Sequence, residues 1–228
     1  MVIIAILIAT TFTANAQVRT ITFTGNTGIT GGAGDVTKLN CFDVRWHLDN
    51  APGGAVGATE QFIAEIGPQV CSLITVGANG AFDRDGNVRC ENIIGVILPP
   101  SLTYLDDYSF YNCGSLEKVT INGNVDDMSA AFTFAYCYNL SAITFTQTTP
   151  PTDMYGAFYN AGRDVNEVVV NLPYKAKESV WRDALIAAGL DANKLTIKVA
   201  RYPNAPRKTT KIKEIRIKQG KVEIKPRE

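Results

Sequence analysis

The residues with the greatest capacity for chemistry are five cysteines and one histidine. The cysteines occupy positions 41, 71, 90, 113 and 137, and His47 is the only imidazole. Structural zinc sites use closely spaced Cys and His ligands, but the sequence contains no Cys-x-x-Cys pair. A serine or cysteine hydrolase needs a base beside its nucleophile, and no Gly-x-Ser-x-Gly elbow occurs. We therefore predict that the protein is not an enzyme, that it has no metal and no cofactor, and that His47 lies in a loop.

A second candidate for chemistry is the short acidic segment 83–87. Calcium loops place oxygen ligands at alternate positions around a turn bent by Gly, as Asp83, Asp85 and Asn87 do. In an EF-hand alignment, however, Ala81 falls at the first ligand position and no Glu closes the site. A plain turn is therefore the preferred interpretation.

Three of the cysteines mark an internal repeat. Cys90, Cys113 and Cys137 are each followed by apolar residues three, six and eight positions later, and Gly162 begins a fourth copy. The copies are 23, 24 and 25 residues apart, which is typical of solenoids. Residues six and eight positions on share one face of a strand. The predicted inward residues are Val96 and Leu98, Val119 and Ile121, Ile143 and Phe145, and Val168 and Val170.

The repeat position also predicts the state of the cysteines. Cys90, Cys113 and Cys137 are expected in the core as packing thiols, with a disulfide between adjacent coils as the alternative. Cys41 and Cys71 lie outside the repeat and could pair in an oxidising compartment. The odd number of cysteines leaves at least one without a partner.

The segment from Leu98 to Val119, LPPSLTYLDDYSFYNCGSLEKV, resembles the leucine-rich repeats of BspA-like bacterial surface proteins. That family repeats Pro-x-Ser-Val-Thr-x-Ile, then Ala-Phe-x-x-Cys, then Leu-x-x-Val. When copies of this family pattern are counted from Leu98, the second departs from it at Asp126, and the third, which leads to Gly162, lacks its Cys. The resemblance covers about residues 90–171, and it implies a curved solenoid with a role in adhesion or other protein interactions.

We predict a leucine-rich repeat solenoid of about four coils, with short parallel strands joined by irregular or short helical turns. Its expected N-terminal cap contains a helix over 58–66, with Phe62, Ile63 and Ile66 at helical spacing. A capping helix over 176–188 is expected to present Val180, Trp181, Leu185 and Ile186 on one face and to end at Gly189. The predicted boundaries are 1–16 signal peptide, 17–87 N-terminal capping region, 88–173 solenoid, 174–200 C-terminal cap and 201–228 basic tail.

The two ends of the chain predict its location. Residues 1–16 combine an apolar run with Ala14-Asn15-Ala16, a pattern typical of a cleaved signal peptide. No apolar run reaches 18 residues, so we predict a secreted or cell-surface protein without a transmembrane segment.

The tail has a different charge from the rest of the chain. Residues 201–228 carry ten Lys or Arg against three Glu, a net +7 that leaves −7 elsewhere, because the chain holds 22 of each sign. Ile215 and Ile217, then Val222 and Ile224, alternate with charged residues around Gln219-Gly220, which predicts a hairpin.

The predicted function is macromolecular binding or adhesion at the cell surface, with a structural cell-envelope component as the alternative. The expected partner is a protein or glycoprotein that contacts the outward strand face, and the tail could bind an anionic surface polymer. Nucleic acid is not expected, because no aromatic-studded basic groove is apparent. Tyrosines in the turns, from Tyr104 to Tyr159, are a second candidate surface, or simply cover the core. The predicted binding residues are Lys118, Thr120, Asn122, Ala142, Thr144, Thr146, Glu167, Val169 and Asn171.

Overall fold

A computed structural model describes most of the chain after the predicted signal peptide. The described residues are 18–25, 34–76, 79–83, 87–126, 128, 132–201, 212–218 and 221–226. The signal-peptide prediction for 1–16 lies outside them. No helix within the described part of the chain has the length and apolarity needed to cross a membrane.

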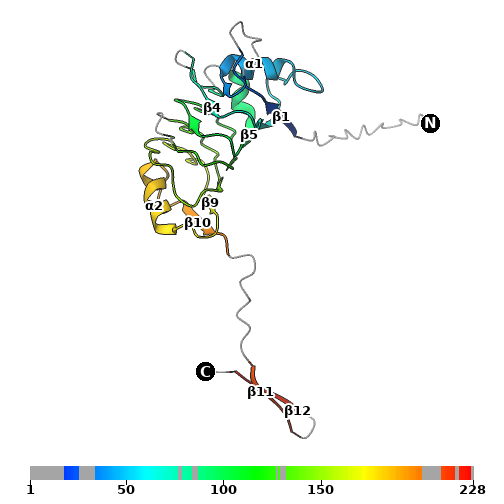
Figure 1. The fold of residues 1–228 in the computed structure, drawn as a ribbon, viewed down its shortest axis with the longest axis vertical. Helices are drawn as coiled ribbons and strands as arrows, with labels where there is room; N and C mark the ends of the chain where they lie inside the picture. Colours follow the sequence, from blue (N-terminus) through cyan, green and yellow to red (C-terminus); the bar gives the residue numbers. More distant parts are fainter. Residues whose placement is uncertain are drawn as a thin grey trace, which may run out of the picture.

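Parallel strands laid side by side in chain order form the main sheet, as a solenoid requires (Figure 1). Each strand pairs in parallel with the next in the order β1-β3-β5-β7-β8-β9-β10. The strands are β1 (Arg19–Phe23), β3 (Phe62–Ile66), β5 (Ile93–Leu98), β7 (Lys118–Ile121), β8 (Ala142–Phe145), β9 (Val168–Leu172) and β10 (Leu195–Val199).

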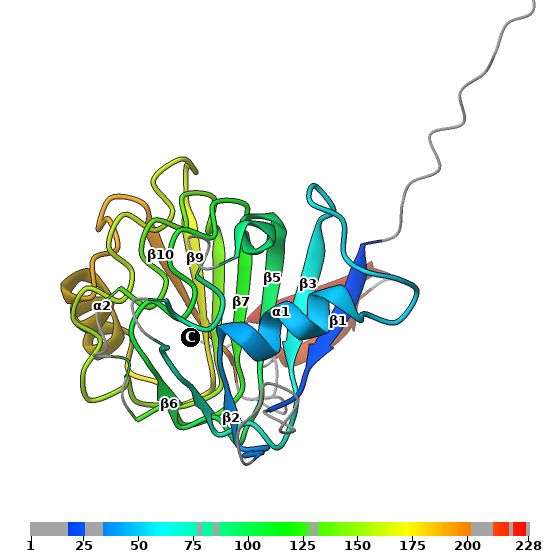
Figure 2. The same ribbon diagram turned by 90° about the horizontal axis from the view of Figure 1, so that it is seen from above.

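A smaller parallel sheet lies on another side of the coils (Figure 2). It consists of β2 (Lys38–Leu39), β4 (Ser72–Leu73) and β6 (Tyr104–Leu105). Leu39, Leu73 and Leu105 from these strands are fully buried in the single apolar core. The core of the coils therefore lies between the main sheet and this smaller sheet, and both sheets contribute side chains to it.

Stacked phenylalanines fill the turns between the coils. Phe82, Phe110, Phe134 and Phe158 are fully buried, and successive rings stack with centroids 4.9, 5.0 and 5.5 Å apart. This spacing is close to the ~4.8 Å between neighbouring strands, so the ring ladder follows the rise of the solenoid.

The predicted strands of the four repeats are present as β5, β7, β8 and β9. All eight predicted inward residues are buried, with at most 2% of their surface exposed. The main sheet also contains three strands beyond these four repeats, namely β1 and β3 before them and β10 after them. The repeat pattern could not reveal these strands because none follows a Cys at the repeat spacing.

The predicted helix over 58–66 is wrong, because Phe62–Ile66 forms strand β3. Phe62, Ala64 and Ile66 are buried in alternation, and β3 pairs with β1 on one side and with β5 on the other. A run of five mostly apolar residues fits either period, and the neighbouring strands decide between them. The helix of this region is instead α1 (Cys41–Asp49), which Asn40 and Asp43 begin with a capping box.

The predicted C-terminal helix is confirmed as α2 (Glu178–Ala187), and Gly189 follows it with a left-handed φ of 107°. Trp181 and Leu185 are buried as expected, but Val180 and Ile186 are 47% and 39% exposed. The buried stripe is narrower than predicted because α2 covers only the end of the coils. Figure 1 shows α1 and α2 at opposite ends of the main sheet.

The predicted hairpin is confirmed as the antiparallel pair β11 (Ile212–Lys218) and β12 (Lys221–Pro226). Ile215 pairs with Ile224, and Ile217 pairs with Val222. The expected turn at Gln219-Gly220 lies outside the described residues.

Candidate binding surface

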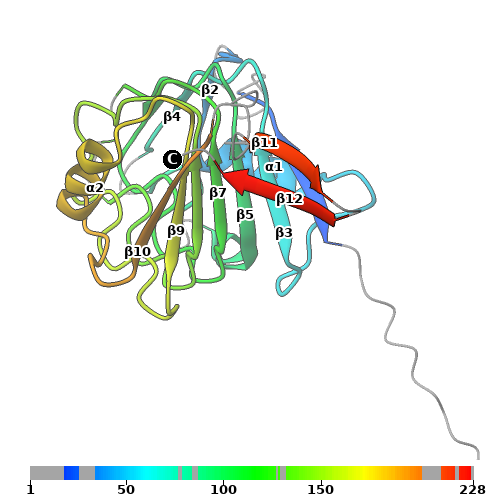
Figure 3. The ribbon, with the colours of Figure 1, turned by 90° about the horizontal axis from the view of Figure 1, so that it is seen from below.

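Most of the predicted binding residues belong to the outward face of the main sheet, whose strands β3, β5, β7, β9 and β10 are labelled in Figure 3. Two rows cross neighbouring strands in register. Lys118 pairs with Ala142, which pairs with Val169, and Thr120 pairs with Thr144, which pairs with Asn171. Asn122 and Thr146 follow directly after β7 and β8. Eight of the nine residues therefore lie on or at the end of three adjacent strands, β7, β8 and β9.

Glu167 is the exception, because the fourth repeat is displaced by two residues. Glu167 stands five residues after Gly162, as Lys118 and Ala142 stand five after Cys113 and Cys137, so the repeat spacing predicts one row of the three. In the structure Ala142 pairs with Val169, and Glu167 precedes β9. A shift of two residues keeps each side chain on its own side of the strand. Val168 and Val170 thus remain buried despite the displacement.

Polar groups on this face come from Lys118, from the row of Thr120, Thr144 and Asn171, and from Asn122 and Thr146 at the strand ends, and some of them bond to one another or to the backbone. The Asn171 side-chain amide donates to Thr144 Oγ1 over 3.4 Å, and the Thr146 hydroxyl donates to the Ile121 carbonyl over 3.3 Å. Lys118 is exposed, and the other members of the two rows are partly exposed. Among the described residues, no cluster of His, Cys, Asp and Glu has the arrangement of a metal site. The chemistry available on this face is recognition through hydroxyl, amide and ammonium groups.

Residues of two earlier strands extend the same face and were missed in the sequence. Gly95 and Ile97 on β5 pair with Lys118 and Thr120, while Ile63 and Glu65 on β3 pair with Gly95 and Ile97. The positions five and seven after Cys90 would have identified Gly95 and Ile97. Ile63 and Glu65 could not be found this way because their segment was predicted as a helix.

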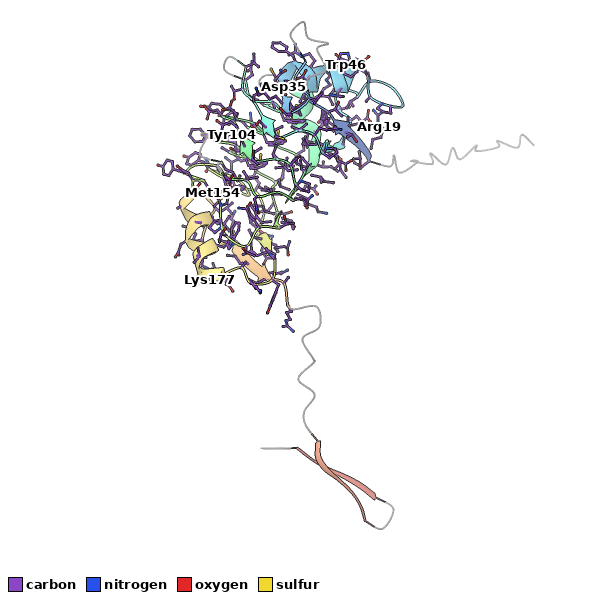
Figure 4. All side chains as sticks on the ribbon, in the orientation of Figure 1. Arg19, Asp35, Trp46, Tyr104, Met154 and Lys177 are labelled. Atoms are coloured by element: carbon purple, nitrogen blue, oxygen red, sulfur yellow. The ribbon has the colours of Figure 1, made fainter. Side chains whose placement is uncertain are left out.

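The tyrosines of the turns form a separate surface. Tyr136 makes edge-to-face contacts with Tyr111 and Tyr159, at centroid distances of 5.3 and 5.6 Å. Tyr155 is 80% exposed. Figure 4 labels Tyr104 and Met154 on the side of the molecule opposite the main sheet. Most of these rings pack on one another along the turns, away from the two polar rows.

The repeat cysteines are buried, as predicted. The thiols of Cys113 and Cys137 donate to the carbonyl oxygens of Phe82 and Phe110 over 3.3 and 3.2 Å. Burial raises the pKa of the Cys90 and Cys113 thiols far above the ordinary value, so both remain protonated and unreactive. All five cysteines are free thiols. The pairing of Cys41 with Cys71, and the alternative of a disulfide between coils, are therefore not present.

His47 lies in helix α1 and not in the predicted loop. Its Nε2 lies 3.1 Å from the Thr24 carbonyl oxygen and 3.2 Å from the Thr24 backbone nitrogen, and its ring contacts those of Phe23 and Trp46. Burial lowers the pKa of His47, despite the opposing effects of Thr24 and Asp43. These contacts give His47 a structural role in joining α1 to β1.

The acidic segment 83–87 is described only at its ends, Asp83 and Asn87. The Asn87 side-chain oxygen accepts from the Arg89 backbone N–H over 3.2 Å and caps the 3-10 helix η1 (Val88–Asn92). The Asn87 backbone N–H donates to the Asp83 carbonyl over 2.9 Å. Both contacts fit the preferred interpretation of a turn.

Comparison with known proteins agrees with the repeat geometry. The family model described as "BspA type Leucine rich repeat region (6 copies)" matches residues 87–173. No curated protein and no solved structure matches the chain. Regions of this type are typically surface- and binding-related and are generally non-catalytic. Residues 87–173, which contain β5 to β9, therefore form a leucine-rich repeat region of the BspA type.

Proposed function

We propose that this protein is exported and binds another protein or a glycoprotein through the outward face of its main sheet. Adhesion at the cell surface is the setting that this activity implies. We assign to this protein an extracellular location and a macromolecular ligand, and no catalytic step.

The observation that carries the proposal is the polar row of Thr120, Thr144 and Asn171, which crosses β7, β8 and β9 in register beside the exposed Lys118. Hydroxyl and amide groups from Thr120, Thr144 and Asn171 face outward at a regular spacing. Open faces of repeat proteins are extended surfaces that commonly bind macromolecules. The apolar run and small-residue pattern in 1–16 support export.

The test is binding of the chain from Gln17 to Glu228 to a panel of extracellular glycoproteins, immobilised one by one. The variant T120R/T144R places two long charged side chains in the middle of the face. We expect it to weaken binding at least tenfold, because bulk and charge both oppose close contact. The matched control, N139R/D164R, changes exposed turn residues and should bind like wild type.

Two outcomes would contradict the proposal. Equal binding by T120R/T144R and wild type would place the site elsewhere on the molecule. If wild type binds no member of the panel, the alternative of a structural cell-envelope component without a discrete ligand gains support.

A further inference from the structure

One part of the outward face is apolar, unlike the polar rows beside it. Ile63, Ile94 and Ile97 are only partly buried there. Ile97 is in register with Thr120 and Thr144 on the next two strands, so an apolar residue continues a row of threonines. An open depression of about 240 Å³ lies among these isoleucines. It is also lined by Gly95, Val96, Glu117, Lys118 and Thr120.

The depression exists because Gly95 has no side chain. Gly95 lies between Ile63 and Lys118 in register, and the atoms nearest to a Cβ built on it would be Ile63 side-chain atoms at 3.4, 3.5 and 3.9 Å. A Cβ at Gly95 would therefore be in van der Waals contact with Ile63, and the nearest atoms do not force the backbone to move.

The strand pairing at the depression is also irregular. Phe62 pairs with Ile93 while the next residue, Ile63, pairs with Gly95, which leaves Ile94 as an extra residue. Bulges and glycines inside strands recur where a ligand or another chain approaches the backbone closely. The irregular pairing and the missing side chain occur at the same place, which points to a contact site.

Size and charge define what the depression can accept. An apolar cavity of about 150 Å³ is large enough for benzene, so this larger open space admits a branched aliphatic or aromatic side chain. Lys118 borders it, is exposed, and makes no ion pair with any described residue. Glu117 also borders it, while Glu65 accepts a hydrogen bond from the Thr22 hydroxyl over 3.3 Å. A carboxylate on the ligand is attracted by Lys118 and repelled by Glu117, so we expect it on the Lys118 side of the depression.

We propose that the depression at Gly95 binds an aliphatic or aromatic side chain of an extended protein segment with Asp or Glu within two residues. This inference rests on the proposed function, because it assigns a ligand class to one part of the same face.

The test is selection of binders from a random 12-residue peptide display library on immobilised wild-type protein. We expect enriched peptides to share a large apolar residue with Asp or Glu one or two positions away. Gly95→Val fills the depression with a residue that favours strands. It should weaken these peptides at least tenfold while leaving the thermal midpoint equal or higher. Ile97→Thr, which copies Thr120, should weaken them about threefold or more.

Charge reversal tests the orientation. Lys118→Glu should weaken the selected peptides at least fivefold, and peptides with Lys in place of their acidic residue should bind this variant better than wild type does. Gly114→Val is the matched control, because a Cβ at Gly114 meets nothing within 4 Å and Gly114 does not line the depression. It should leave binding unchanged.

The results separate this inference from the proposed function. Peptides that bind Gly95→Val as tightly as wild type but are lost with Thr144→Arg would overturn the inference and leave the binding face intact. Absence of any enriched peptide would also overturn it, while the glycoprotein panel tests the face independently.

Discussion

At the scale of single residues, the fourth repeat lacks the cysteine of the other three. The Val165 backbone N–H donates to the Gly162 carbonyl, as those of Leu116 and Leu140 do to Cys113 and Cys137. However, the buried residue three positions after the stacked Phe158 is Ala161, as Cys137 is after Phe134, so Ala161 occupies the Cys place and Gly162 is an added residue beside it. Gly162 has a φ of 68°, and a Cβ there would overlap Val168 Cγ2 and lie 2.8 Å from the Leu140 carbonyl oxygen. Position 162 therefore requires glycine, because it has no space for a side chain.

A side chain at this added residue, as in Gly162→Cys, should consequently destabilise the protein. We expect a loss of about 1–3 kcal/mol in the free energy of unfolding, from overpacking and a disfavoured φ. Urea unfolding followed by circular dichroism measures it, with Gly114→Cys as a control at an open position. Equal stability of wild type and Gly162→Cys would contradict the packing described for this turn.

His47 predicts how stability depends on pH. Burial lowers its pKa in the folded state, so below its ordinary value of about 6.5 the unfolded chain binds more protons than the folded one. The free energy of unfolding should fall as pH decreases from about 7 to about 5.5. His47→Gln should remove this slope, because the chain has no other histidine. The buried Asp43 carboxyl has a raised pKa and acts in the opposite direction at lower pH. A slope that persists in His47→Gln would assign the effect to other groups.

Residue patterns predicted the interior better than the surface. The apolar residues six and eight positions after each Cys were located correctly because their burial depends only on strand alternation. The predicted row of Lys118, Ala142 and Glu167 was wrong because the alternation of side chains does not fix the register between strands. A shift of two residues changes the register but leaves the alternation the same. The repeat spacing places Gly95 on the outward face, but the depression that Gly95 lines also depends on Ile63 from another coil, which the spacing does not locate.

At the scale of elements, α2 closes one end of the core through a single large side chain. Trp181 is fully buried, its ring centroid lies 4.5 Å from that of Phe145, and its indole N–H donates to the Thr148 carbonyl over 3.0 Å. The spacing of its apolar residues predicted this helix. The sequence alone could not show that only Trp181 and Leu185 would be buried, because that depends on how much of α2 the coils cover.

Removal of the Trp181 side chain should destabilise the fold strongly. Trp181→Ala should lower the free energy of unfolding by about 3–5 kcal/mol. The matched control Val180→Ala, at an exposed neighbour, should change it by less than about 0.5 kcal/mol. Chemical denaturation followed by far-ultraviolet circular dichroism compares the two. Similar losses for both variants would mean that α2 does not pack as described.

Strand β3 shows where local sequence is insufficient. Its five residues fit a helix or a strand, and only pairing with β1 and β5 selects the strand. Strand β10 was missed for a related reason, since Leu195, Ile197 and Val199 alternate but belong to no repeat. Both strands are stabilised by pairing with strands of neighbouring coils, and a local sequence pattern does not contain these partners.

At the scale of the whole molecule, one parallel sheet runs from β1 to β10 with a helix near each end. The repeat region matched by the family model supplies β5, β7, β8 and β9 of this sheet. The outward face consequently extends on both sides of the predicted binding residues. Its apolar part lies over β3 and β5 and its polar rows cross β7, β8 and β9.

The basic tail should act separately from the folded coils. Among the described elements, β11 and β12 pair only with each other. Deletion of residues 202–228 should leave the thermal midpoint unchanged but lower the salt concentration at which the protein elutes from immobilised heparin, an anionic polymer. Elution of both forms at the same salt concentration would contradict a role for the tail in binding anionic polymers.

The most direct test of the central claim is site-specific photo-crosslinking to a glycoprotein that the panel identifies as a ligand. The probe p-benzoylphenylalanine replaces Thr144 on the outward strand face in one variant and Tyr155 in the turns in another. The account predicts a covalent adduct from position 144 and none from position 155. An adduct from position 155 alone would contradict it, and would place recognition on the aromatic turns instead of the sheet.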